Sequence, residues 1–117
     1  MILCVMDDLI FSIKIRTAAK SIGGIDLLFE RSPDMILPRI REQRPSLVIF
    51  DLNSRTMGPI AAIAGMKSDP ELTGIRTLGF VSHVDADTVA AARAAGIDQV
   101  LARSAFAAQL GQILTSA

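Results

Sequence analysis

The stretch that decides the fold is Leu47-Val48-Ile49-Phe50-Asp51, a short apolar run that ends in one acidic residue. A similar run, Ile2-Leu3-Cys4-Val5-Met6, is followed directly by Asp7 and Asp8. Short apolar runs bounded by turn signals are typical of strands that are buried on both faces, as in a parallel sheet. The sequence therefore predicts a parallel sheet in which two strands end in acidic residues.

Strand-like and helix-like segments alternate along the rest of the chain. The expected strands are Ile2–Met6, Asp26–Phe29, Leu47–Phe50, Thr77–Val81 and Gln99–Leu101. The expected helices are Leu9–Ser21, a segment that begins at Ser32-Pro33, Pro59–Lys67, Ala86–Ala95 and Ala105–Leu114. Strict alternation indicates βαβ units with right-handed crossovers. We therefore expect an α/β protein, a doubly wound five-stranded parallel sheet in a three-layer sandwich.

Two of these helices carry features that bear on packing. The first mixes apolar and basic residues at helical spacing, which predicts an amphipathic helix. Its apolar positions are Ile10, Ile13, Ile15 and Ala18. In the second, Pro38 falls inside the expected helix, so it should kink the helix or delay its start.

Length and composition limit the class of protein. The chain has 117 residues, half of them hydrophobic, which is enough for one domain with a real core, spanning residues 1–117. Basic and acidic residues cancel to a net charge of zero, which argues against a nucleic-acid-binding module. No apolar run approaches the roughly 20 residues that a membrane-spanning helix needs. The single cysteine, Cys4, indicates a reducing cytoplasm and is expected to be buried.

The acidic residues at the strand ends suggest a chemistry. Ligands of open parallel sheets bind beyond the carboxyl ends of the strands. If the two strands are neighbours, Asp7, Asp8 and Asp51 converge there and repel one another unless a cation joins them. Oxygen-only ligands favour a hard divalent ion such as Mg²⁺. An aspartate beside such an ion can accept a phosphoryl group.

The order and spacing of several residues resemble the receiver domain of two-component response regulators, along nearly the whole chain. The residues that carry the resemblance are the acidic pair Asp7 and Asp8 after the first strand, Asp51 after the third, Asn53 two positions later, Ser82 at the end of the fourth strand, and the stretch 94–101 leading into the fifth. The resemblance implies the flavodoxin-like (βα)5 fold.

The resemblance also implies a function. Asp51 would accept a phosphoryl group from a histidine kinase or phosphotransfer protein, while Asp7, Asp8, Asp51 and the backbone carbonyl of Asn53 hold Mg²⁺. Ser82 and Arg103 would bind the phosphoryl oxygens. With no attached output domain expected, this stand-alone receiver would signal through a downstream protein partner in trans. Such a domain is a signalling domain and not a conventional enzyme, acting at most on its own aspartyl-phosphate.

The sequence departs from the receiver pattern at several positions. Arg103 replaces the usual lysine, and Ser104 replaces the proline that follows it. Arginine is a wider planar fork than lysine, although it can still bind phosphate. Val100 replaces the aromatic switch residue, and Arg55 adds a cation near the pocket. His83 lies where the family usually has a small residue, so it would narrow access to the site.

These departures leave a second hypothesis open, a pseudo-receiver that binds a partner or a second copy of itself without phosphorylation. If Arg103 pairs with Asp51 or Asp7, the pocket is neutralised internally and needs no metal. The apolar residues Phe106, Leu110, Ile113 and Leu114 would suit a homodimer surface, but a buried core face explains them equally well. A third hypothesis, a small phosphatase, lacks a general acid or base beside the nucleophile.

Overall fold

The computed structural model describes residues 1–82 and 85–117, and its centre is one sheet of five parallel strands. The strands are β1 (Ile2–Val5), β2 (Leu27–Glu30), β3 (Leu47–Asp51), β4 (Arg76–Val81) and β5 (Gln99–Ala102). Their order across the sheet is β2-β1-β3-β4-β5, and every neighbouring pair is parallel. This is the flavodoxin-like order, so the predicted fold class is confirmed.

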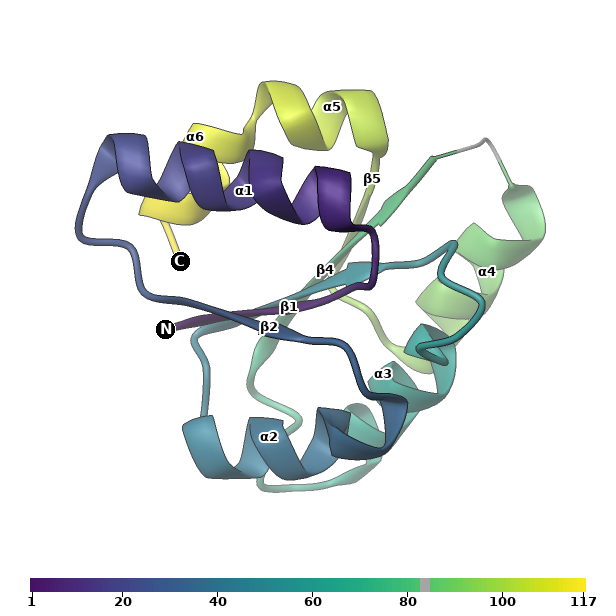
Figure 1. Cartoon of the computed structure of the whole chain (residues 1–117). Coiled ribbons are helices and arrows are strands. Elements are labelled where there is room, and N and C mark those ends of the chain that lie inside the picture. Colours follow the sequence, from purple (N-terminus) through teal and green to yellow (C-terminus); the bar gives the residue numbers. More distant parts are fainter. Residues whose placement is uncertain (83–84) are drawn as a thin grey trace.

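The helices cover both faces of the sheet. They are α1 (Leu9–Ile22), α2 (Ile36–Gln43) with a preceding 3₁₀ turn at Pro33–Met35, α3 (Pro59–Ser68), α4 (Ala86–Ala95), α5 (Arg103–Ala108) and α6 (Leu110–Thr115). Helices α1, α5 and α6 lie on one face, and α2, α3 and α4 lie on the other (Figure 1). The result is the three-layer arrangement that alternating strands and helices predict.

Strand β3 lies at the centre of the sheet, between β1 and β4. The register pairs Val5 with Phe50 and Asp51 with Phe80. Every residue of β1 and β3 is buried, as expected for strands covered on both faces. Because Asp51 is the last residue of β3, its side chain lies at the carboxyl edge of the sheet, one position beyond the pairing with β1.

Two hydrophobic clusters, one on each face, make up the core. On the α2, α3 and α4 face, buried residues such as Val48, Phe50 and Ile63 pack together. On the opposite face, Phe11, Phe80 and Phe106 form an aromatic cluster with ring centroids 4.9–5.8 Å apart. Phe106, Leu110 and Leu114 are all buried within this second cluster and Ile113 packs against it, so these residues form a core face. The apolar side chains proposed for a homodimer surface are therefore part of the core, which is the other explanation that the sequence allowed.

The buried face of α1 differs from the prediction. Its buried residues are Phe11, Ser12, Ile15 and Ala19, while the Ile10 side chain is 82% exposed and Ile13 is 59% exposed. The helix has more apolar residues than one face can bury, and the ring of Phe11, packed against Phe80, sets which face turns inward. Of the expected apolar positions, Ile15 is buried and Ala18 is half-buried.

Two further helices show how local sequence limits an element. Helix α2 begins at Ile36, so Pro38 lies in its first turn, where a backbone N–H needs no helical partner. Of the two effects expected of Pro38, a kink or a delayed start of the helix, the structure shows the delayed start. The expected single helix over 105–114 is wrong in one respect, because the chain leaves helical geometry at Gln109 and divides into α5 and α6. Gly111, a weak helix former, lies two residues beyond this break.

In the described parts of the chain, every helix is too short or too polar to cross a bilayer.

Candidate functional site

Residues from four strand ends gather at the carboxyl edge of the sheet. Asp51 ends β3, Asp7 and Asp8 lie between β1 and α1, Ser82 follows β4, and Arg103 follows β5. Hydrogen bonds connect Arg103 with both Asp8 and Ser82, across separations of 95 and 21 residues in the sequence. The sequence predicted that Asp7, Asp8 and Asp51 converge, because the carboxyl ends of neighbouring parallel strands share one edge, and the receiver resemblance implied that Ser82 and Arg103 join them.

Asp51 is the most buried of the three acids, with 8% of its surface exposed. Its Oδ1 accepts a hydrogen bond of 3.0 Å from the backbone N–H of Asn53. Burial raises the pKa of Asp51 above its ordinary value, and the negative charges of Asp7 and Asp8 add to this effect. The Asn53 hydrogen bond and the charge of Arg103 act in the opposite direction without cancelling it. Asp51 is therefore a partly desolvated carboxylate whose charged form is disfavoured chiefly by burial.

Asp8 has two separate partners, one for each carboxylate oxygen. Its Oδ1 caps α1 by accepting from the backbone N–H of Phe11 at 3.0 Å, and its Oδ2 accepts from Nη2 of Arg103 at 3.1 Å. The Phe11 hydrogen bond and then the Arg103 contact lower the pKa of Asp8, although partial burial works against them. Asp8 thus stays ionised while it begins the helix and neutralises an arginine.

Asp7 is held by hydroxyl groups from the loop that follows β3. Thr56 donates to Oδ2 of Asp7, and Ser54 donates to Oδ1 at 3.4 Å. The same Ser54 hydroxyl accepts from the backbone N–H of Met57 at 3.3 Å. These contacts join the β1–α1 connection to the β3–α3 loop beside Asp51.

Asn53 connects the third and fourth strand ends. Its side-chain oxygen accepts a hydrogen bond from the backbone N–H of Ser82, while its own backbone N–H donates to Asp51. The receiver resemblance predicted a role only for the Asn53 backbone carbonyl. The side-chain contact therefore adds a second, structural role, in which Asn53 positions the end of β4 relative to Asp51.

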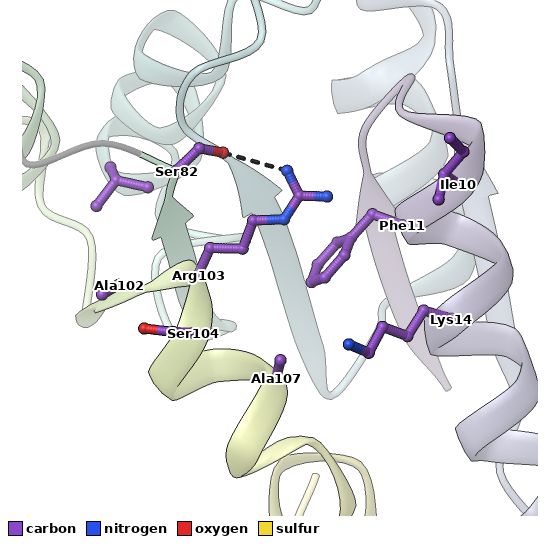
Figure 2. Close-up of a pocket in the computed structure, with 9 residues that line it drawn as sticks. Ile10, Phe11, Lys14, Ser82, Ala102, Arg103, Ser104 and Ala107 are labelled. Carbon is purple, nitrogen blue, oxygen red and sulfur yellow. Dashed lines mark hydrogen bonds between the residues drawn. The ribbon is translucent and has the colours of Figure 1, made fainter.

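Arg103 makes three contacts at the start of α5. Nη2 bonds Asp8, Nη1 donates to the Ser82 hydroxyl at 3.3 Å, and the guanidinium carbon lies 4.1 Å from the centroid of the Phe11 ring. Figure 2 shows the guanidinium reaching from α5 toward α1, between Ser82 and Phe11. The partner of Arg103 is therefore Asp8, and neither Asp51 nor Asp7, the two partners that the alternative hypothesis named.

Other positions singled out in the sequence lie around this site. Arg55 and Ser104 are exposed, and the half-buried Val100 packs against the core. His83 lies outside the described residues. Thr56 and Phe11 were missed by the sequence reasoning, since a hydroxyl and a core phenylalanine carry no signal of their own until the loops bring them to Asp7 and Arg103.

A pocket of about 650 Å³ opens beside Arg103, between α1 and α5. Apolar and cationic side chains share its wall. The lining residues that carry its chemistry are Ile10, Phe11, Lys14, Ser82, Arg103 and Ser104 (Figure 2). Asp51 does not line this pocket, which therefore adjoins the acidic residues without containing Asp51.

The acidic residues have the right chemistry for a magnesium ion, because all their donors are oxygens. In residues 1–82 and 85–117, however, no three His, Cys, Asp or Glu side chains are arranged to hold a metal ion. The Asp8 carboxylate accepts a hydrogen bond from Arg103, and the Asp7 carboxylate accepts hydrogen bonds from the hydroxyl groups of Thr56 and Ser54. The oxygen donors therefore fit the ion in kind, and in this structure they are engaged by groups of the protein itself.

No protein-family model and no curated protein matches the chain. Solved structures do match it over nearly its full length. The Mn²⁺-bound form of the response regulator Rcp1 is 21% identical, with a TM-score of 0.79, and the alignment covers 96% of this chain and 89% of that one.

Two further structures agree. The chemotaxis response regulator CheY4 of Vibrio cholerae is 14% identical, with a TM-score of 0.81 and coverage of 98% and 95% of the two chains. The receiver domain of NtrX from Brucella abortus is 20% identical, with a TM-score of 0.77 and coverage of 99% and 96%. At these identities the similarity shows the fold, and the predicted resemblance to receiver domains is confirmed at that level.

Proposed function

We propose that this chain is a receiver domain of a two-component system that accepts a phosphoryl group on Asp51. The observation that carries the proposal is the position of Asp51, which is the last residue of the central strand and lies among Asp7, Asp8, Ser82 and Arg103. A carboxylate and a phosphorylated donor are both negatively charged, so positive groups must offset their repulsion before the carboxylate can attack phosphorus. The receiver fold of the matched structures supports this assignment.

Each side chain has a definite part in this chemistry. An oxygen of Asp51 attacks phosphorus, and the bond between phosphorus and the donor's histidine nitrogen breaks with its electron pair remaining on that nitrogen. Ser82 and Arg103 are the donors that can bind the transferred phosphoryl oxygens. Asp7, Asp8, Asp51 and the Asn53 carbonyl are the oxygens proposed to hold Mg²⁺, which offsets negative charge on attacker and donor when bound. One matched structure is a Mn²⁺-bound response regulator, which supports a divalent ion here.

A protein partner has a surface to dock on beside this site. Leu9, Ile10 and Ile13 of α1 expose between 56% and 82% of their surface. Exposed apolar side chains gathered on one helix are typical of contact surfaces. A histidine kinase or phosphotransfer protein seated there would bring its phosphohistidine toward Asp51, and a downstream partner would be the output. A cytoplasmic location remains a prediction from the single cysteine.

The test is the intact mass of the protein after incubation with acetyl phosphate and Mg²⁺. We expect the wild type to gain one phosphoryl group, Asp51→Asn to gain none, and the control Asp26→Asn, which removes an exposed carboxylate just before β2 at the opposite edge of the sheet, to match the wild type. An unmodified wild type would contradict the proposal and favour the interaction module that is not phosphorylated. Labelling that persists in Asp51→Asn would place the phosphoacceptor elsewhere.

A further inference from the structure

We propose that the pocket between α1 and α5 is a binding site for a small organic monocarboxylate whose body is apolar. The volume of the pocket, about 650 Å³, lies within the range of about 300–1,000 Å³ that is typical of small-molecule sites. The proposal does not depend on phosphorylation, because Asp51 does not line the pocket.

Apolar side chains from both sides of the pocket supply the surface for the body of the ligand. Ile10 contributes from α1, where 82% of its surface is exposed. Ala102 and Ala107 contribute from the end of β5 and from α5. Because alanine is small, Ala107 leaves open a space that a longer side chain would fill. A ligand that covers these side chains removes apolar surface from water, which favours binding.

The charges around the pocket favour an anion. Lys14 and Arg103 both line it, and no acidic side chain among the described residues does. Arg103 is already paired with Asp8 at 3.1 Å, whereas no ion pair in residues 1–82 and 85–117 involves Lys14. One positive charge is therefore left without a counter-ion. It matches the single negative charge of a carboxylate better than the higher charge of a phosphate monoester.

The unpaired charge and the apolar surface lie close enough to serve one ligand. The Lys14 side chain points from α1 toward Ala107 on α5, and the Phe11 ring lies between Lys14 and Arg103 (Figure 2). A carboxylate beside the Lys14 ammonium therefore leaves the apolar part of the ligand against Ala107. Arg103 keeps its own hydrogen bonds and forms the wall toward the acidic residues, so the ligand displaces no contact of the protein.

The test is an NMR titration without any phosphodonor, with phenylacetate as the probe and its uncharged amide, phenylacetamide, as the comparison. We expect phenylacetate to shift the methyl resonances of Ile10 and Ala107 with a Kd of about 1 mM at low ionic strength. Phenylacetamide should bind about threefold more weakly, because it gains no attraction from the ammonium. Equal affinities of the two compounds, or no shift of these two resonances at about 10 mM phenylacetate, would overturn the proposal.

The part played by the charge is tested with Lys14→Gln. This variant should bind phenylacetate about threefold more weakly than the wild type and bind phenylacetamide equally well. Lys20→Gln is the matched control, since it removes the same charge from the last turn of α1, outside the pocket, and should bind both compounds as the wild type does. Unchanged phenylacetate binding by Lys14→Gln, or the same loss in both variants, would contradict the role of Lys14.

The part played by the cavity is tested with Ala107→Leu. The longer side chain should weaken the binding of both compounds about tenfold, because it takes up the space of the ligand. Ala108→Leu, at an exposed position of the same helix that does not line the pocket, should bind both compounds as the wild type does. Equal binding by the two leucine variants would show that the compounds bind elsewhere. Lys14 is exposed, so Lys14→Gln keeps the proposal testable even if Ala107→Leu does not fold.

Discussion

The guanidinium carbon of Arg103 lies 4.1 Å from the centroid of the Phe11 ring, so a charged group of the candidate site rests on a residue of the hydrophobic core. The same ring lies 4.9 Å from Phe80 and 5.8 Å from Phe106. One face of Phe11 therefore belongs to the site and the rest to the core. Changes at Phe11 are expected to act on both stability and the position of Arg103.

The cation–π contact can be measured by a double-mutant cycle with Phe11→Leu and Arg103→Gln. Phe11→Leu alone should lower the free energy of unfolding by about 2 kcal/mol, since it removes two aromatic pairs and the cation–π contact while keeping most of the apolar volume. The coupling energy with Arg103→Gln should be about 0.5–1 kcal/mol by urea unfolding. Strict additivity of the two losses would show that the ring and the guanidinium do not interact. Phe50→Leu, whose ring packs in the core cluster on the opposite face of the sheet, is the control that should be additive with Arg103→Gln.

Asp51→Asn should raise stability at neutral pH. The pKa of Asp51 is raised above its ordinary value of 3.8, chiefly by burial, so the folded state holds this proton more tightly than the unfolded state. The free energy of unfolding of the wild type therefore falls as the pH rises from about 3.8 through the raised pKa, and it stays reduced above that window. Asparagine never ionises, so its folded state does not carry the cost of a buried negative charge. The melting temperature of Asp51→Asn should exceed that of the wild type at pH 7.5.

The difference between these two proteins should level off well below pH 3.8, where Asp51 is protonated in both the folded and unfolded states of the wild type. Gln112→Ala, at an exposed position without a titratable group, is the control, and its difference from the wild type should not change with pH. A melting-temperature gain for Asp51→Asn that is constant with pH would contradict the electrostatic explanation and point to packing.

The alternation of strands and helices and the buried strands could be predicted because they depend on simple patterns, whereas the strand order was implied only by the resemblance to receiver domains. Alternating apolar and helical segments admit few topologies, and the all-apolar runs before Asp7 and Asp51 require a strand covered on both faces. The exposed face of α1 could not be predicted in the same way. Ile10 and Ile13 are apolar, but the packing of Phe11 against Phe80 decides which side of the helix turns inward.

The place of the candidate site residues could be predicted better than their partners. Strand ends bring Asp8, Ser82 and Arg103 to one edge whatever the loops do. The choice of Asp8 as the partner of Arg103 depends on the reach of a long side chain across the edge, and on Phe11 beneath it. The hold of Thr56 on Asp7 depends on the path of a loop. Spacing along the chain carries no information on either contact.

Thr77→Val should destabilise the protein by about 1–3 kcal/mol. Thr77 is buried, and its hydroxyl group donates to Asp98 Oδ2 at 2.9 Å. The oxygen of this hydroxyl group also accepts a hydrogen bond from the backbone N–H of Asp98 at 3.0 Å. Valine keeps the shape but leaves this N–H without its acceptor, which carries the cost of an unmet hydrogen bond. Chemical unfolding measures the loss. The control Thr73→Val, at an exposed position, should change stability by less than about 0.5 kcal/mol, and equal effects at the two sites would contradict the role of the hydroxyl.

Gly79→Ala should also destabilise the protein, by about 1–3 kcal/mol, because the added methyl group overpacks the core. A Cβ at this position of β4 would lie 2.6 Å from Leu52 Cδ1 and 2.8 Å from Ile97 Cδ1. Gly111→Ala is the matched control, since a Cβ there meets no atom within 4 Å. In helix α6 that change should stabilise by about 0.5–1 kcal/mol. Thermal melting of both variants checks the opposite signs, and a gain of stability in Gly79→Ala would contradict the tight packing.

Cys4 should react with a thiol reagent only when the sheet opens. The residue is fully buried in β1, and burial raises the pKa of its thiol from 9.0 to about 12. Burial therefore leaves far less thiolate at pH 8 than an exposed cysteine has, and only the thiolate attacks. Labelling of the native protein should therefore be far slower than labelling in urea.

Since β1 lies inside the sheet, the labelling rate of Cys4 should follow global unfolding. A variant destabilised by about 2 kcal/mol, such as Phe11→Leu, should therefore label about thirtyfold faster. Labelling rates that ignore stability would show that Cys4 is reached through a local opening instead.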